Sequence, residues 1–138
     1  MIWFVLFCFA FAAAILFWLL WRQNAARLLA WRTCAHVMIC ELFVRQTTGK
    51  PELSVACHEP FRGTVASYIV SRGSECLVSI AIHWDAAPPA IRYCVGGFRK
   101  SNLRTTFVFE LKEVLREVEQ YLSGIACPAS VVSHAPGA

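Results

Sequence analysis

The chain has 138 residues, of which 57 % are apolar and 16 % are charged, and its mean hydropathy is +0.51. Thirteen Lys and Arg residues against nine Asp and Glu residues give a formal net charge of +4. This mild excess suits anionic lipid headgroups or an acidic partner. Because the basic residues form no dense runs, it argues against a nucleic-acid-binding protein.

Residues 1–21 contain no charged residue, no Gly, no Pro and no hydroxyl group. As a helix they would be about 31 Å long, close to the hydrocarbon thickness of a bilayer, about 30 Å. Because the segment has no polar face, we predict a transmembrane helix rather than a surface helix. The rest of the chain is long enough for one small domain and too short for two.

Aromatic and basic residues flank the predicted span, as they do in membrane anchors, where they lie at headgroup level. The predicted interface anchors are Trp3, Trp18, Trp21, Arg22, Arg27 and Arg32. The alternative is a cleavable signal peptide, which would have a basic n-region and a shorter apolar stretch. Only Asn24-Ala25-Ala26 offers a weak cleavage site, so we favour the anchor.

Residues 22–48 are predicted to continue as a helix beyond the span, because no Gly or Pro occurs before Gly49. Helically spaced positions form one stripe, which consists of Leu28, Arg32, Ala35, Ile39 and Phe43, with Leu29, His36 and Leu42 beside them. This stripe predicts an amphipathic helix. Gly49 is a favoured left-handed cap and Pro51 cannot continue a helix, so the helix should end here.

Residues 49–124 are predicted to form a small α+β domain. Alternating or β-branched segments predict strands around residues 53–55, 64–70, 76–84 and 90–95, and residues 103–109 could form another. Turn residues such as Arg72-Gly73-Ser74 join them by short connections, which favours an antiparallel meander.

A second amphipathic helix is predicted at residues 110–122, ending at Ser123-Gly124. Its apolar face consists of Leu111, Val114, Leu115, Val118, Tyr121 and Leu122. Residues 125–138 lack periodicity and are predicted to be a disordered tail. The expected fold class is therefore α+β. An N-terminal transmembrane helix continues into a long amphipathic helix, followed by a small antiparallel β-meander and a C-terminal helix.

The chain has an odd and high number of cysteines, which are Cys8, Cys34, Cys40, Cys57, Cys76, Cys94 and Cys127. None of them forms a C-x-x-C pair or follows the spacing of a disulfide-stapled hairpin. We expect most to be reduced core residues, since a free cysteine behaves as a small apolar side chain. A single structural disulfide is the alternative.

Two pairs of residues could together bind a metal ion. His36 and Cys40 lie four apart on a predicted helix and therefore share a face, and Cys57 and His58 are adjacent. Neither spacing is that of a known zinc finger, so a packing His and a buried Cys are the simpler interpretation. We predict no metal site and no cofactor.

Two further groups could carry chemistry. Ser79, His83 and Asp85 place a hydroxyl, a base and an acid near one strand end, but no Gly-rich oxyanion loop accompanies them. The sequence at residues 96–100 has two Gly and two cations, but lacks the strand–loop–helix context of a phosphate-binding loop. We therefore predict that the protein is not an enzyme.

The order of elements resembles that of a known family. Residues 70–80 look like its strand, Gly-containing turn and apolar strand, residues 89–95 look like the start of its next strand, and residues 48–51 look like its helix end. Over residues 25–98 the chain resembles the cytochrome c oxidase assembly factor 1 family and the related intermembrane-space receptor subunit of the mitochondrial presequence translocase. The resemblance implies a single-pass inner-membrane protein that docks on respiratory-chain or translocase subunits, with no cofactor and no catalytic residue.

We therefore expect a non-enzymatic membrane protein whose domain binds other membrane-complex subunits, as an accessory subunit or assembly factor in the mitochondrial inner membrane. Two alternatives stay open. One is a membrane-tethered metal- or thiol-dependent protein that uses His36, Cys40, Cys57 and His58. The other is a component of a bacterial or viral membrane machine. Sidedness is open as well, because the positive-inside rule places the domain in the cytoplasm or matrix and the resemblance places it in the intermembrane space.

Overall fold

A computed structural model describes residues 1–125 of the chain. These residues fall into two compact units, Met1–Cys34 and the residues from Ala35 onward. The predicted tail beyond residue 125, including Cys127, lies outside the described residues. The second unit begins within the predicted helical extension, because the last turns of that helix pack into its core.

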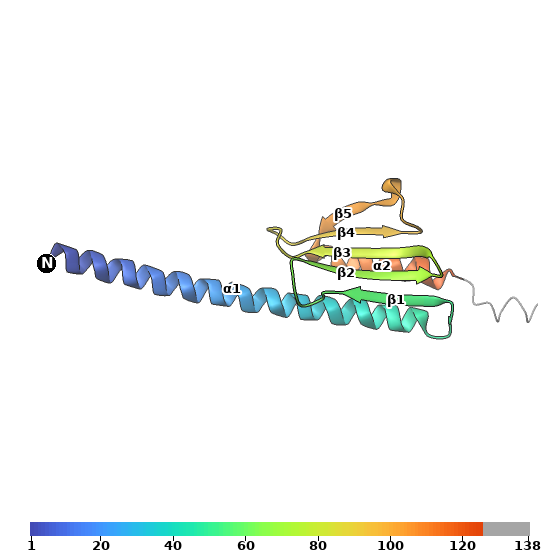
Figure 1. Ribbon diagram of the computed structural model, residues 1–138, viewed down its shortest axis with the longest axis horizontal. Helices are drawn as coiled ribbons and strands as arrows, with labels where there is room; N and C mark the ends of the chain where they lie inside the picture. Colours follow the sequence, from blue (N-terminus) through green and yellow to red (C-terminus); the bar gives the residue numbers. More distant parts are fainter. Residues whose placement is uncertain (126–138) are drawn as a thin grey trace, which may run out of the picture. The chain divides into compact units, whose positions relative to one another are not determined.

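Helix α1 (Ile2–Thr47) contains both the predicted span and the predicted extension (Figure 1). It ends where the sequence indicated. Gly49 has a φ of +81°, a left-handed conformation that Gly adopts without steric cost. In the last turn, the hydroxyl of Thr47 donates to the carbonyl of Phe43 at 2.7 Å, and the hydroxyl of Thr48 donates to that of Val44 at 2.6 Å. These side-chain bonds add to the backbone bonds of the last turn, in which the Val44 carbonyl also accepts the Thr48 N–H at 3.0 Å.

The first unit is helical and leaves its apolar side chains uncovered. None of residues 1–34 is buried, although most of them are large and apolar. Helix α1 is the one helix within residues 1–125 that is long and apolar enough to cross a membrane. A core helix of similar composition would bury this surface against the rest of the protein, and none of the most apolar window is buried here.

The second unit contains one five-stranded antiparallel sheet in the order β1-β2-β3-β4-β5, seen side by side in Figure 1. The strands are β1 (Leu53–His58), β2 (Val65–Arg72), β3 (Glu75–His83), β4 (Ala90–Val95) and β5 (Arg104–Phe107). The predicted meander and the α+β fold class are confirmed. The predicted strand at residues 103–109 is shorter, because single turns of 3-10 helix flank it, η1 (Lys100–Asn102) and η2 (Val108–Glu110).

Helix α2 (Leu111–Ser123) and the final turns of α1 cover one face of this sheet, and the core lies between them. The sheet contributes alternate residues of the central strands, such as Tyr68, Ile80 and Ile91. The helices contribute the apolar stripes that the sequence predicted, which are Ala35, Ile39, Leu42 and Phe43 from α1 and Leu111, Val114, Leu115, Val118 and Leu122 from α2. Each large apolar side chain buried here stabilises the fold by roughly 1.5–3 kcal/mol.

The α1 stripe does not extend as far as the sequence suggested. Leu29 was expected beside it, but its side chain is exposed, and burial begins only at Ala35. The opposite face of the sheet carries mostly small or polar side chains, such as Ser67, Ala81 and Thr105. Such side chains are compatible with contact with water. Only the other, apolar face of the sheet therefore needs to be covered, and the two helices cover it.

Candidate functional site

The predicted interface anchors all belong to the first unit. Trp3, Trp18 and Trp21 are exposed, as are Arg22 and Arg27, whereas Arg32 is half-buried. The guanidinium carbon of Arg22 lies 5.5 Å from the centre of the Trp18 ring, a cation–π contact one turn apart on the helix. A role for these six side chains at a membrane interface stays a prediction.

His36 and Cys40 lie together, as their spacing predicted. The Cys40 Sγ is 3.7 Å from the His36 ring nitrogens, and His36 Nδ1 is 3.0 Å from the hydroxyl oxygen of Tyr68. The Phe61 ring packs edge-on against the His36 ring, with the ring centres 4.8 Å apart. Cys57 is the cross-strand neighbour of Tyr68 and so faces the same side of the sheet.

His58 does not belong to this cluster. Consecutive strand residues face opposite sides of a sheet, so Cys57 faces the helices and His58, opposite Ser67, faces away from them. The four residues considered as metal ligands are therefore not assembled around one point. Within residues 1–125, no group of three or more His, Cys, Asp or Glu side chains could hold a metal ion.

The thiols in this region are poorly suited to nucleophilic chemistry. Burial raises the pKa of the Cys40 thiol, and partial desolvation together with the nearby Cys40 thiol raises the pKa of Cys57. A raised pKa keeps a thiol protonated near neutral pH, and the thiolate is the reactive form. The arrangement of His36, Cys40 and Tyr68 therefore joins helix α1 to the sheet by packing and hydrogen bonding.

The expectation that most cysteines are core residues is wrong for the six that are described. Cys8, Cys34 and Cys57 are exposed, Cys40 and Cys76 are intermediate, and Cys94 alone among these six is buried. No disulfide joins these six residues. Cysteine is compatible with both core and surface positions, so residue type alone did not decide its burial.

The other two groups considered in the sequence are also accounted for by the fold. Ser79 and His83 share one face of β3, but they are four positions apart, which along a strand is about 13 Å. That distance is too long for a hydrogen bond between nucleophile and base.

The backbone N–H groups of Gly96 and Gly97 both donate to the carbonyl of Leu77, at 2.9 and 3.2 Å. They serve the sheet and are not available to bind a phosphate.

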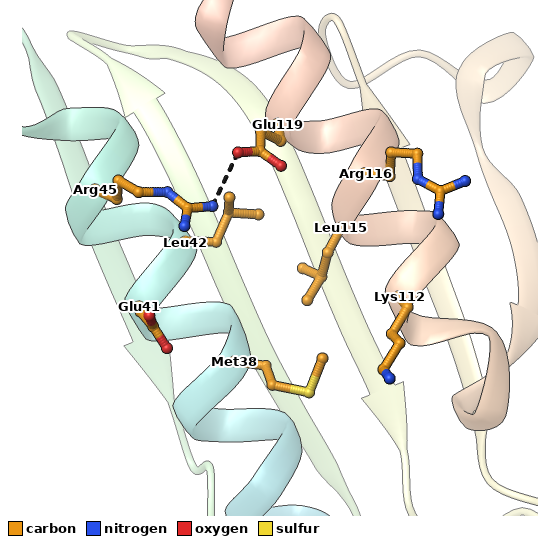
Figure 2. A pocket seen from close by; sticks show the side chains of 8 residues that line it. All are labelled: Met38, Glu41, Leu42, Arg45, Lys112, Leu115, Arg116 and Glu119. Carbon is orange, nitrogen blue, oxygen red and sulfur yellow. Dashed lines mark hydrogen bonds and ion pairs between the residues drawn. The ribbon is translucent and has the colours of Figure 1, made fainter.

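The structure instead forms a groove between the last turns of α1 and helix α2, with the sheet behind it (Figure 2). Its volume is about 330 Å³. Each helix contributes four residues at helical spacings of three, four and seven, which are Met38, Glu41, Leu42 and Arg45 from α1 and Lys112, Leu115, Arg116 and Glu119 from α2. Residues at these spacings share one face of a helix, so the two walls are continuous ridges.

The groove has an apolar floor and a charged rim. Leu42 and Leu115 are only 5 % and 8 % exposed, and Met38 is half-buried beside them. Arg45 and Glu119 form an ion pair of 2.9 Å across one end, where both side chains are well exposed. An exposed pair of this kind contributes about 0–1 kcal/mol.

Further bonds join the end of α1 and the turn after it to α2, near the Arg45 end of the groove. The Lys50 ammonium donates to the Leu122 carbonyl at 2.8 Å, and the Ser123 hydroxyl donates to the side-chain oxygen of Gln46 at 3.2 Å. These contacts fix the spacing of the two helices at their C-terminal ends.

Two charged residues of the rim stand apart from the others. Glu41 and Lys112 are exposed, and the side chain of neither has a hydrogen bond or ion pair with any residue of the described range 1–125. By contrast, Arg116 pairs with Glu113 at 3.0 Å, and Arg45 pairs with Glu119. The sequence indicates the apolar face of α2. No local pattern shows that the edge of α2 with Lys112 and Arg116 adjoins Met38 and Glu41, so the groove was not predicted.

In comparisons with known proteins, no family model, no curated protein and no solved structure matches the chain.

Proposed function

We propose that the chain is a single-pass membrane protein whose α+β domain binds other subunits of a membrane complex. The observation that carries this proposal is the contrast between uncovered apolar surface throughout residues 1–34 and the packed second unit with an open groove. In water such a helix would expose large apolar side chains, and a bilayer would cover them.

The proposed setting is the mitochondrial inner membrane, with the protein as an accessory subunit or assembly factor of a respiratory-chain or translocase complex. The support for this setting is the resemblance carried by residues 25–98, together with the element order of span, helix and meander. The domain acts by binding. Its His36 side chain is hydrogen-bonded to Tyr68, and its groove is lined by apolar and charged side chains.

The proposal is tested by gentle detergent extraction of the tagged full-length protein, followed by native gel separation and mass spectrometry. A structural subunit is expected to comigrate in fixed proportion with the subunits of one complex. An assembly factor is expected in substoichiometric amounts with incomplete complexes. A protein that migrates alone at about its own mass would contradict both forms of the proposal.

The membrane span and the sidedness are tested separately. A spanning helix is expected to keep the protein in the membrane pellet after alkaline carbonate extraction. Protease treatment of intact and of ruptured organelles then reports on which side residues 35–125 lie. Release of the intact chain into the carbonate supernatant, or removal of the apolar helix from the mature protein, would show that residues 1–21 are not an anchor.

A further inference from the structure

We infer that the groove between α1 and α2 docks an amphipathic helix of a partner protein, with an acidic residue beside Lys112 and a basic residue beside Glu41. This inference rests on the proposed function, because it names the kind of segment that the domain binds. It depends on three features of the groove, namely the nature of its walls, its apolar floor and its uncompensated charges (Figure 2).

The walls favour a helical occupant over an extended one. Both walls are α-helices, whose backbone groups already hydrogen-bond within each helix, so the groove offers a ligand side chains alone. An extended peptide laid there would leave its own N–H and C=O groups without backbone partners. A helix satisfies these groups internally and presents side chains at three- and four-residue spacings, which match the ridges of the two walls.

The floor indicates which face of that helix would be buried. A helix with its side chains is about 10–12 Å wide, so it would lie along the groove and insert side chains between the walls. Leu42 and Leu115 lie deep in the groove, and Met38 lies nearer its mouth. Met is unbranched and flexible, and it adapts to partner side chains of different shapes. The inserted side chains are therefore expected to be apolar.

The charges indicate the orientation of the docked helix. Glu41 and Lys112 lie on opposite walls, carry opposite signs and have no partner within residues 1–125. Lys112 lies in the first turn of α2, at the positive end of the helix dipole. The Lys112 ammonium and the helix dipole therefore both favour an incoming carboxylate. A basic residue would likewise be favoured beside Glu41. One charge of each sign on opposite walls therefore selects one direction of the partner helix.

The same charges argue against a lipid as the occupant. The rim alternates in sign, with Glu41 and Glu119 as well as Arg45, Lys112 and Arg116. An anionic headgroup attracted by the cations would also approach the two carboxylates. A protein segment can place a different charge opposite each rim residue, which one headgroup cannot do.

The experiment is site-specific photocrosslinking of the full-length protein in its own membranes. A benzophenone amino acid replaces Met38 in the groove, and in a control protein it replaces Thr105 on the opposite face of the sheet. Crosslinked peptides are identified by mass spectrometry. We expect Met38 to label one partner protein, within a segment that has apolar residues at helical spacing flanked by an acidic and a basic residue. We expect Thr105 not to label that segment.

Charge reversal then tests the orientation. Lys112→Glu is expected to lower the crosslinking yield about tenfold, because it places like charges side by side, whereas Lys112→Arg keeps the charge and the yield. A carboxylate in the first turn of a helix is favourable, so Lys112→Glu should not unfold the domain. Once the partner segment is known, exchanging its acidic residue for Lys is expected to restore crosslinking to the Lys112→Glu protein.

Several outcomes would overturn the inference. One is a crosslink from Met38 to lipid, to a second copy of the chain or to a segment without helical periodicity. The others are the absence of any crosslink and a crosslinking yield that Lys112→Glu does not change. The native gel separates this failure from that of the proposed function. If the chain still comigrates with a complex, the groove inference fails and the proposed function stands. If the chain migrates alone, the proposed function fails too.

Discussion

Helix α1 contains two stretches that are both rich in large apolar residues but lie in opposite environments. In residues 2–34, aromatic side chains such as Phe9 and Phe17 are 71 % and 72 % exposed. In residues 35–47 of the same helix, Phe43 is fully buried, and so is Ile39. The difference lies in patterning. The first stretch is apolar on every side until Arg22, whereas the second alternates buried apolar residues with polar ones such as Glu41 and Arg45. The arrangement of apolar residues around the helix therefore distinguishes the core segment from the candidate span.

The comparison is tested most strongly by making the same substitution in both stretches. Phe43→Ala removes a fully buried ring and is expected to lower the free energy of unfolding of the second unit by about 3–5 kcal/mol. Phe9→Ala is expected to leave it unchanged. Hydrogen–deuterium exchange of the β3 amides in mild detergent measures both effects. Equal loss of protection in the two variants would contradict the division into two units.

A charge placed in the first stretch tests whether a bilayer surrounds it. Phe11→Arg near the middle of the proposed span is expected to cost about 2.5–3.5 kcal/mol of membrane insertion. Ala26→Arg, beyond the span and beside Arg27, is the matched control and is expected to cost little. The fraction of protein that resists carbonate extraction measures the effect. If Phe11→Arg were retained as fully as Ala26→Arg, the proposed span would be wrong.

The contact between α1 and the sheet is expected to matter less than the core. Tyr68→Phe removes the hydroxyl that lies 3.0 Å from His36 Nδ1 and should lower the free energy of unfolding by about 0.5–1.5 kcal/mol. Tyr121→Phe is the control, because no hydrogen bond of the Tyr121 hydroxyl is found within residues 1–125. Denaturant unfolding measures both variants, and an equal effect of the two would exclude a special role for the His36–Tyr68 contact.

A pH dependence is expected from the second unit. Burial and the neighbouring Cys76 thiol raise the pKa of Cys94, so the folded state favours the protonated thiol. This contribution is complete below the pKa of the unfolded thiol, about 8.5, and is lost as the pH rises through the higher folded pKa. Stability should therefore fall above about pH 8.5, and Cys94→Ala should flatten the fall. Cys8→Ala, in the other unit, should leave the pH profile of unfolding unchanged.

The smallest effect is expected at the ion pair that closes the groove. A double-mutant cycle of Arg45→Ala and Glu119→Ala should give a coupling energy of about 0.2–1 kcal/mol, because both side chains are well exposed. The coupling should fall further at high salt. A value of several kcal/mol would mean that the pair is shielded from water, and the groove would then be narrower in solution than in this structure.

The elements that sequence analysis predicted best were those specified by local patterns. The α2 stripe, the end of α1 at Gly49 and the four main strands follow from helical or alternating periodicity and from turn residues, each of which acts within a few positions. The pairing of His36 with Cys40 was predictable for the same reason. The separation of Cys57 from His58 follows from the strand alternation alone, once the residues are assigned to a strand.

Other features depended on tertiary contacts. The sequence did not indicate where burial on α1 begins, because that depends on how far the sheet extends beneath the helix. It did not indicate which cysteines are buried, since their burial depends on neighbours in other elements. It also gave no sign that the Gly96 and Gly97 amides are bonded to the carbonyl of Leu77 on the preceding strand.

By itself, the sequence determined the apolar first helix, the amphipathic faces and the antiparallel meander, because these depend on residues that are close along the chain. Only the tertiary structure decided the groove. Arg45 and Glu119 are 74 residues apart, and they meet because the sheet between them folds into a single layer that holds both helices on one face. Glu41 and Lys112, whose side chains have no partner within residues 1–125, lie on opposite walls for the same reason. Side-chain positions across such distances are set by strand pairing and packing, which no local sequence pattern specifies.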